Sequence, residues 1–326
     1  MKPAAEVVKT IVLDGPLLSK NILSKVGPRI SRVTEISRTI SGKTELTMPK
    51  LGVISVGGER ADAGSYLTQK KAFFSGMGLD LEVLVSPTEA GESRVIEQIE
   101  ILNKDPSYSG IMLYLPLPTA MRNSTTSILN RIDPLKDVEC MNPDLYEANM
   151  SSLQVGNETL LRESVQKMVL PCTYLACLHV LDEYGIETLG RKAAVIGNGF
   201  SVGMPIAAML QQRGALVEQF DRSAGKLREQ IQDKDIIVTG TGSKNLFDLD
   251  FVKEGCTVLD LGLTSLGEGK YRGDVPYDKL IGRARLVTPV PKGIGPITSA
   301  MLIRNLVLLW ERQTLLGRTL EDIDKK

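Results

Sequence analysis

The sequence contains a single histidine, His179, among its 326 residues, and its four cysteines form no C-x-x-C pair. Zinc sites usually draw on clustered His and Cys ligands, and a Ser-His-Asp triad requires an imidazole base. Both kinds of site are therefore disfavoured. His179 follows Cys177 in an apolar stretch, so we expect it to pack within a helix. We expect a chemistry that uses neither a metal nor imidazole.

Long apolar runs and an excess of one charge are missing as well. No apolar run approaches the roughly 20 residues of a membrane-spanning helix. Lys9 and Asp14 interrupt the only short apolar stretch near the N-terminus, which argues against a signal peptide. Lys and Arg total 39, as do Asp and Glu, so the formal net charge is zero. We therefore expect no nucleic-acid partner and no membrane partner.

Targeting to an organelle is disfavoured by the distribution of charge near the N-terminus. Arg29, Arg32 and Arg38 lie among serines, as in a mitochondrial presequence. Acidic residues at positions 6, 14 and 35 are atypical of such a segment. We expect a cytoplasmic protein.

Short apolar runs alternate with longer amphipathic stretches along most of the chain. Near-continuous apolar strands separated by helices are typical of parallel sheets that are covered on both faces. The sequence therefore predicts the α/β class. The expected strands are 51–56, 81–85, 111–115, 193–196, 216–220, 236–239 and 258–261, and the expected helices are 66–77, 92–103, 205–213, 224–232 and 299–313.

Two αβα domains are expected, because a new glycine-rich strand–turn–helix pattern begins near residue 191. We expect a catalytic domain at 1–170, completed by the C-terminal helix region 297–326. A Rossmann-like dinucleotide-binding domain with a parallel sheet would be inserted at 171–296. The Pro/Gly-rich segment 288–298 is expected to be an irregular loop.

A dinucleotide site is indicated by Gly197, Gly199 and Gly203, which follow an expected strand and precede an expected helix. Glycines at such a turn let the backbone approach a pyrophosphate, which the N-terminus of the helix then holds. Asp221 ends the next strand and is placed to bind an adenosine ribose, which favours NAD over NADP. The neighbouring Arg222 leaves NADP open, because an arginine can pair with a 2′-phosphate.

Further segments make the pattern more specific. They are Ser65-Tyr-Leu-Thr-Gln-Lys-Lys71, Gly110-Ile-Met-Leu-Tyr-Leu-Pro-Leu-Pro118, Lys136-Asp-Val-Glu139, Leu170-Pro-Cys-Thr173, Gly197-Asn-Gly-Phe-Ser-Val-Gly-Met-Pro205, Gly273-Asp-Val275 and Thr288-Pro-Val-Pro-Lys-Gly-Ile-Gly-Pro-Ile-Thr298. In this order, across nearly the whole chain, they resemble the methylenetetrahydrofolate dehydrogenase/cyclohydrolase family. The resemblance implies hydride transfer from methylenetetrahydrofolate to a nicotinamide dinucleotide, a folate substrate and a homodimer.

The resemblance also assigns roles to residues. Tyr66 would stack on the folate and Lys70, four residues later on the same helix face, would orient the reacting centre. The implied substrate-binding residues are Tyr114, Asp137, Glu139, Pro291, Gly293, Gly295 and Pro296. The implied cofactor-binding residues are Thr173, Gly197, Asn198, Gly199, Ser201, Val202, Gly203, Asp221, Arg222, Thr239, Gly240, Thr241 and Thr298.

Several positions depart from the family pattern. Tyr114 stands where bifunctional members carry glutamine, and tyrosine cannot offer the paired donor and acceptor of an amide. We therefore expect weak or absent cyclohydrolase activity, and the chain most resembles the monofunctional NAD-dependent branch. Asn198-Gly199 replaces Arg-Ser, which again favours NAD. Glu139 replaces Asp, and Lys292 replaces a glycine of the substrate loop.

Three alternatives stay open at this point. One is a bifunctional NADP-dependent dehydrogenase/cyclohydrolase, since Lys70 is retained. Another is a dehydrogenase of the shikimate or amino-acid type with Lys70 as general base, although such an enzyme has no need of the 288–298 segment. The last is a non-catalytic NAD-binding sensor. The retained Tyr66 and Lys70 argue against it, because a protein that only binds NAD has no evident use for this pair.

Overall fold

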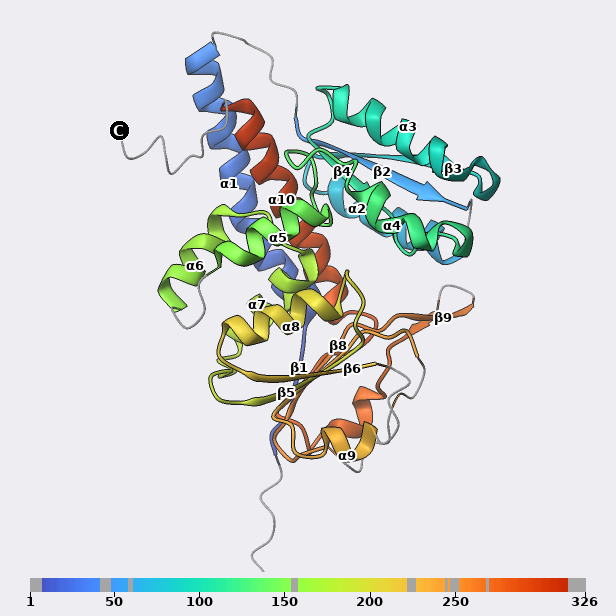
Figure 1. Cartoon of the computed structure of the whole chain (residues 1–326). Coiled ribbons are helices and arrows are strands. Elements are labelled where there is room, and N and C mark those ends of the chain that lie inside the picture. The colour runs from blue at the N-terminus through green and yellow to red at the C-terminus, as the bar shows by residue number, and fades with distance from the viewer. Residues whose placement is uncertain are drawn as a thin grey trace, which may run out of the picture. The chain divides into compact units, whose positions relative to one another are not determined.

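A computed structural model describes residues 8–41, 48–57, 61–153, 158–221, 227–243, 246, 252–267 and 270–315. The chain forms two compact units (Figure 1). Unit 1 consists of Met1–Ser19, Leu153–Leu161 and Thr173–Thr298, and unit 2 consists of Lys20–Ser152, Arg162–Cys172 and Ser299–Lys326. No helix in the described ranges is both long enough and apolar enough to cross a membrane.

Unit 2 is built on a parallel three-stranded sheet in the order β3-β2-β4. Its strands are β2 (Lys50–Val56), β3 (Asp80–Ser86) and β4 (Gly110–Leu113). Six residues of β2 are buried in succession, as expected for a central strand that is covered on both faces. The helices α2 (Ala61–Ser75) and α3 (Gly91–Lys104) lie on opposite faces of this sheet (Figure 1).

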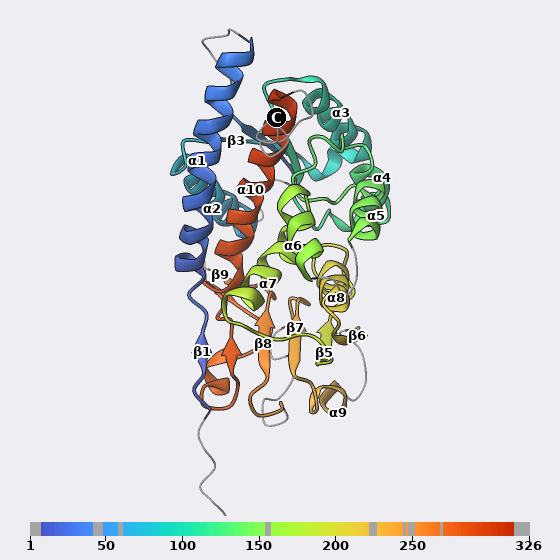
Figure 2. The same ribbon diagram turned by 90° about the vertical axis from the view of Figure 1, so that its left-hand side faces the viewer.

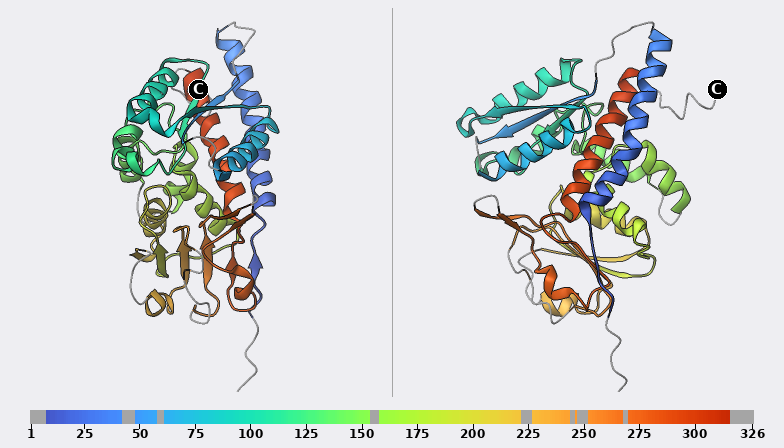
Figure 3. Two further views of the ribbon diagram at one scale, coloured as in Figure 1. Left: turned by 90° about the vertical axis from the view of Figure 1, so that its right-hand side faces the viewer. Right: turned by 180° about the vertical axis from the view of Figure 1, so that it is seen from behind.

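Two long helices complete unit 2. Figure 3 shows α1 (Gly15–Ser41) and α10 (Ile294–Thr314) side by side. The Arg29 Nε of α1 donates to Glu311 Oε2 of α10 at 2.6 Å, and the Arg29 Nη2 donates to the second oxygen at 3.2 Å. Because the Glu311 side chain is fully buried, this bidentate pair compensates its desolvation. The helices α4 (Thr125–Leu129) and α5 (Pro143–Ser152) also belong to unit 2, α6 (Glu158–Lys167) is divided between the units, and α7 (Cys172–Glu183) belongs to unit 1 except for Cys172.

Unit 1 contains a six-stranded sheet in the order β1-β11-β8-β7-β5-β6, and all its paired strands are parallel (Figure 2). The chain passes from β5 to β6 on one side and then to β7 on the other, so the carboxyl end of β5 is a topological switch point. The strands are β1 (Ile11–Val12), β5 (Lys192–Ile196), β6 (Leu216–Phe220), β7 (Ile236–Thr239), β8 (Thr257–Asp260) and β11 (Leu286–Val287), and the helices are α8 (Gly203–Gln212) and α9 (Leu227–Ile231).

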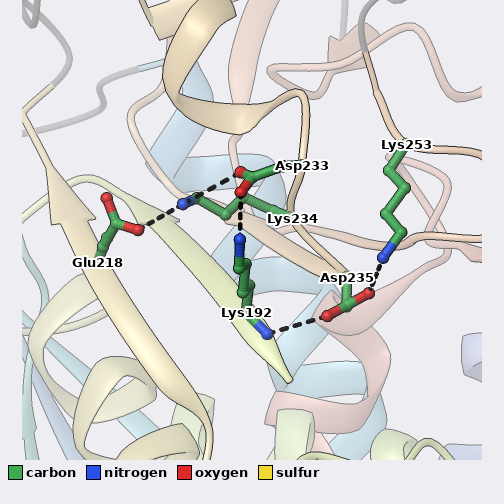
Figure 4. A network of polar contacts seen from close by, with 6 residues as sticks. All are labelled: Lys192, Glu218, Asp233, Lys234, Asp235 and Lys253. Atoms are coloured by element: carbon green, nitrogen blue, oxygen red, sulfur yellow. Dashed lines mark hydrogen bonds and ion pairs between the residues drawn. The ribbon is translucent and has the colours of Figure 1, made fainter. Parts of the chain in front are cut away.

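A network of charged residues links the amino ends of β5 and β7 with the middle of β6 (Figure 4). Lys192 Nζ lies 2.7 Å from Asp233 Oδ2, and Lys234 pairs with both Glu218 and Asp233. Asp235 accepts the backbone N–H of Lys192 at 3.0 Å. This network fixes the end of the sheet opposite to the glycine-rich turn, so it has a structural role rather than a role in a site at the switch point.

The sequence-based α/β prediction is confirmed, and each of the seven expected strands is present. A small antiparallel sheet, β9 (Thr264–Gly267) with β10 (Lys270–Arg272), was not expected, and neither were α1, β1 and β11. The prediction of an irregular 288–298 segment is wrong for its second half, because α10 begins at Ile294. Pro296 is compatible with the first helical turn, where backbone N–H groups need no intrahelical acceptor. The described residues also include the short 3₁₀ helices η1 (Thr88–Ala90), η2 (Thr119–Ser124) and η4 (Tyr277–Leu280).

The predicted domain boundaries at 170 and 296 stay a proposal. The compact units group the N-terminal residues with 173–298, because β1 pairs with β11 of the six-stranded sheet.

Candidate active site

The glycine-rich turn lies directly at the switch point of the six-stranded sheet. Gly197 follows β5 with a φ of 113°, a conformation that favours glycine. A Cβ on Gly203 would lie 1.9 Å from the carbonyl oxygen of Gly197, so only glycine lets α8 begin this close to the turn. A Cβ on Gly199 would meet nothing within 4 Å. The turn is thus closed where it meets α8 and open at Gly199, which fits the approach of a pyrophosphate.

Neighbouring segments hold this turn in place. The Thr173 hydroxyl donates to the carbonyl of Ser201 at 2.8 Å. A Cβ on Gly240 would lie 2.4 Å from Val202 Cγ1, so the segment after β7 packs closely against the turn. The structure thereby brings together the predicted cofactor-binding residues of three segments: Thr173; Gly197 to Gly203, which includes Asn198; and Thr239 to Thr241.

The predicted ribose-binding acid follows β6, the neighbour of β5 in the sheet. Asp221 is exposed, and the carbonyl of Phe220 accepts the backbone N–H of Gly197 at 2.8 Å. Asp221 therefore borders the same end of the sheet as the glycine-rich turn. Arg222 lies outside the described residues.

The 288–298 segment leads from β11 into α10. Gly293 is buried, and a Cβ there would lie 2.3 Å from the carbonyl oxygen of Pro289. Lys292 has a φ of 80°, in the region that favours glycine, and its carbonyl accepts the N–H of Gly15 at 3.0 Å. Pro291 and Gly295 are exposed. Thr298 lies within α10, and its hydroxyl donates to Gly295.

In unit 2, Lys70 of α2 is the central cation. Its side chain is 4% exposed, and its Nζ lies 3.4 Å from the hydroxyl oxygen of Ser299. Burial raises the pKa of the half-buried Glu139 to about 7, although the positive charge of Lys70 opposes this rise. The site therefore places a buried lysine near a carboxyl group whose pKa is raised to about 7. Tyr66 belongs to α2, and its side chain lies outside the described part of the chain.

Asp137 differs from Glu139 in its surroundings. It is 1% exposed, and it accepts the N–H of Glu139 at 3.1 Å and that of Asn142 at 2.6 Å. Burial raises its pKa to about 6, against the effect of these hydrogen bonds. Asp137 thus holds the turn that carries Glu139. The structure supports an indirect role for Asp137 and leaves Glu139 as the carboxyl group beside Lys70.

Three further residues belong to the segments that carry the predicted site. The backbone N–H of the half-buried Tyr114, directly after β4, donates to the carbonyl of Ile54 at 2.9 Å. Lys136 is buried and donates to the carbonyls of Leu102 and Asp105, so it stabilises the end of α3. Burial holds the pKa of the Cys172 thiol well above its usual range, which makes Cys172 a poor nucleophile. Within the described ranges, no cluster of three or more His, Cys, Asp or Glu residues could hold a metal ion.

Comparisons with known proteins cover both halves of this arrangement. Residues 13–139 match the family model for the catalytic domain of tetrahydrofolate dehydrogenase/cyclohydrolase. Residues 171–314 match the family model for the NAD(P)-binding domain of tetrahydrofolate dehydrogenase/cyclohydrolase.

Individual relatives match along nearly their whole length. The bifunctional protein FolD of Nitratiruptor sp. is 34% identical over 296 residues, which are 91% of this chain and 96% of the relative. FolD of Methanosarcina acetivorans is 33% identical over 308 residues, 94% of this chain and 98% of the relative. The crystal structure of the bifunctional FolD from Campylobacter jejuni aligns with a TM-score of 0.79 and 30% identity, covering 93% of this chain and 99% of that chain.

Proposed function

The chain belongs to the tetrahydrofolate dehydrogenase/cyclohydrolase family, and on this basis we propose that it is a methylenetetrahydrofolate dehydrogenase that uses NAD. The reaction would convert 5,10-methylenetetrahydrofolate to 5,10-methenyltetrahydrofolate in one-carbon metabolism.

The two family models and the relatives confirm the family resemblance that was inferred from the sequence. Membership disfavours the alternative of a shikimate-type dehydrogenase.

The buried Lys70 beside Glu139 carries this proposal. Oxidation of the methylene bridge breaks one C–H bond, the hydride leaves with both electrons, and a nitrogen lone pair forms the C=N bond of the methenyl cation. This step needs no strong acid or base, so positioning dominates. When bound, NAD supplies the hydride acceptor. Lys70 would orient the reacting centre, Tyr66 would stack on the folate, and Glu139 would bind the amino groups of the pterin.

The preference for NAD rests on charge at the end of β6. Asp221 is a carboxylate where the adenosine ribose would lie, so it accepts hydrogen bonds from a 2′-hydroxyl and repels a 2′-phosphate. Asn198 and Gly199 add no positive charge to the turn. The glycine-rich turn and the N-terminus of α8 would hold the pyrophosphate.

Weak or absent cyclohydrolase activity is the second part of the proposal. Hydrolysis of the methenyl product requires proton transfer at the attacking water. Lys70 is available for this, but Tyr114 offers only one hydroxyl where an amide would supply both a donor and an acceptor. The competing candidate is a bifunctional NADP-dependent enzyme, and its bifunctional part is favoured by the relatives, which are bifunctional FolD proteins.

Isotope transfer tests the reaction itself. Methylenetetrahydrofolate deuterated at the methylene carbon is incubated with enzyme and NAD, and the reduced nicotinamide is analysed by mass spectrometry. We expect the reduced cofactor to carry deuterium. Reduced cofactor without deuterium, or no turnover while NAD binds, would exclude the proposed reaction, and the second result would favour a sensor.

The homodimer implied by the family resemblance is a separate proposal. Light scattering on the eluting protein is expected to give twice the 35.6 kDa mass of the chain. A mass of a single chain would refute it.

A further inference from the structure

Two buried carboxylates, Asp260 and Asp274, contact the end of β7 and the segment that follows it. Neither is among the site residues predicted from the sequence. Asp260 ends β8 and is 2% exposed, and Asp274 is 0% exposed. Asp260 accepts the N–H groups of Gly262 and Val275, each at 2.8 Å, and the hydroxyl of Thr239 at 3.1 Å. It thereby joins the ends of β7 and β8 to the 273–275 segment.

Asp274 uses both of its oxygens on one short segment. Its Oδ2 accepts the backbone N–H of Thr241 at 2.7 Å and the hydroxyl of Thr241 at 2.9 Å. Its Oδ1 accepts the backbone N–H of Ser243 at 2.9 Å. Three donors from Thr241 and Ser243 thus bind a single carboxylate.

The glycines beside these acids show how tightly the pair is built. A Cβ on Gly262 would lie 2.1 Å from Asp274 Oδ1, and a Cβ on Gly273 would lie 2.1 Å from Asp260 Oδ2. Each carboxylate therefore occupies space that only a glycine leaves open.

Burying an ionised carboxylate is unfavourable unless hydrogen bonds satisfy its oxygens. Backbone N–H groups and a threonine hydroxyl provide this for Asp274, and they all come from 241–243. Burial and the charge of Asp274 both raise the pKa of Asp260, to about 6. The cost of burying the two neighbouring carboxylates is understandable if they fix the backbone of 241–243 in a position that the site requires.

We propose that Asp274, itself seated by Asp260, is a positioning residue that holds the 240–243 segment in the conformation that lines the dinucleotide site. The inference rests on the proposed function, since it takes this site to bind a dinucleotide. Gly240 packs against Val202 of the glycine-rich turn, so a shift of 240–243 disturbs the backbone on both sides of the switch point. Asp274 has no contact with the ligand in this account and acts through Thr241 and Ser243.

The test compares Asp274→Asn with the wild-type enzyme. An amide presents an NH₂ group to one of the two backbone N–H donors, so one of the hydrogen bonds is replaced by a donor–donor clash. We expect the Kd for NAD, measured by calorimetry on the full chain, to rise about tenfold or more. Hydrogen exchange of the 240–243 amides, measured without ligand, is expected to accelerate. Tyr174→Phe is the control, because it removes a buried hydrogen bond to Gln212 in the same unit, and it should change neither quantity.

Each outcome decides between the proposals. If the wild-type chain binds neither NAD nor NADP, the proposed function fails and this inference fails with it. If the wild type binds NAD and Asp274→Asn has the same Kd and the same exchange rates, the inference is overturned while the proposed function stands. If Asp274→Asn does not fold, Thr241→Val decides, since it removes the hydroxyl that donates to Asp274 and accepts from the Ser243 N–H, and keeps the carboxylate. The readout is the Thr241 position, whose backbone N–H still donates to Asp274: faster exchange there supports the inference, and unchanged exchange overturns it.

Discussion

The Nζ of Lys70 lies 3.4 Å from the Oγ of Ser299, so a lysine of α2 and a serine of α10, 229 residues apart in sequence, meet inside one compact unit. Lys70 is buried, so protein groups rather than bulk water surround its Nζ. In our account this lysine would move the proton in hydrolysis, and Tyr114 is the residue that limits that step.

Replacing Tyr114 by glutamine is expected to increase cyclohydrolase activity. The amide supplies a donor and an acceptor on two separate atoms, whereas the phenol has a single oxygen, and a gain of about tenfold or more corresponds to the lower range of acid–base effects. The measurement is the decay of methenyltetrahydrofolate after correction for its spontaneous hydrolysis. Tyr114→Phe is the matched control and should show no gain. Lys70→Gln introduced into the Tyr114→Gln variant should abolish the gain, and a gain that persists without Lys70 would contradict the assigned roles.

Replacing Asp221 by serine is expected to shift the cofactor preference towards NADP. Removing the carboxylate removes its repulsion of a 2′-phosphate and its hydrogen bonds to a 2′-hydroxyl, so the ratio of kcat/KM for NADP to that for NAD should rise about tenfold or more. Glu218→Gln removes a negative charge from the same strand and should leave the ratio unchanged. An unchanged ratio in Asp221→Ser would show that Asp221 does not select the cofactor.

The carboxyl group of Glu139 is expected to make stability depend on pH near neutrality. Burial raises its pKa from 4.5 to about 7, so its stabilising contribution is complete below the unfolded value and is lost as the pH rises through the folded value. Asp137 and Asp260, whose pKa values are about 6, lose theirs at lower pH. Between about pH 6 and about pH 8, the free energy of unfolding should therefore fall more steeply in the wild type than in Glu139→Gln. Equal slopes in denaturant titrations would argue against the raised pKa.

Two glycine-to-alanine substitutions should differ strongly in their effects on stability. Gly203→Ala places a Cβ 1.9 Å from a backbone oxygen, and such overpacking costs about 1–3 kcal/mol. Gly27→Ala lies inside α1, where a Cβ meets nothing within 4 Å beyond the adjacent residues; its expected gain of about 0.5–1 kcal/mol is offset by Pro28, which disfavours the helical conformation of a preceding residue with a Cβ. Urea unfolding of both variants checks this. If Gly203→Ala were as stable as the wild type, the close approach of α8 to the turn would be refuted.

Much of the fold was predictable because its strands carry strong local signals. The strands β2, β5, β7 and β8 are nearly continuous apolar runs bounded by turns, and tertiary structure adds little to that pattern. The two-residue strands β1 and β11 have no such signal, since pairing across the chain defines them. The helix α1 was missed because its Gly27-Pro28 step and its scattered arginines obscure its periodicity.

The site was predictable in its residue types and less so in its geometry. The spacing of Tyr66 and Lys70 predicted a helix, and α2 contains both residues; the glycines after β5 predicted a turn before a helix, and α8 follows them. The sequence could not distinguish Asp137 from Glu139, because only the three-dimensional turn shows that the first carboxylate faces its own backbone. Asp260 and Asp274 were missed, although an acid that ends an apolar strand and an acid after Gly273 are signals that could have revealed them.

Steady-state oxidation of methylenetetrahydrofolate by the purified protein, with NAD and NADP in parallel, tests the central claim most directly. The absorbances of reduced nicotinamide and of methenyltetrahydrofolate are followed separately in the same reaction. We predict a strong preference for NAD together with accumulation of the methenyl product. A preference for NADP with no accumulation would contradict the account and identify a bifunctional enzyme, whereas the absence of turnover with both cofactors would exclude a dehydrogenase.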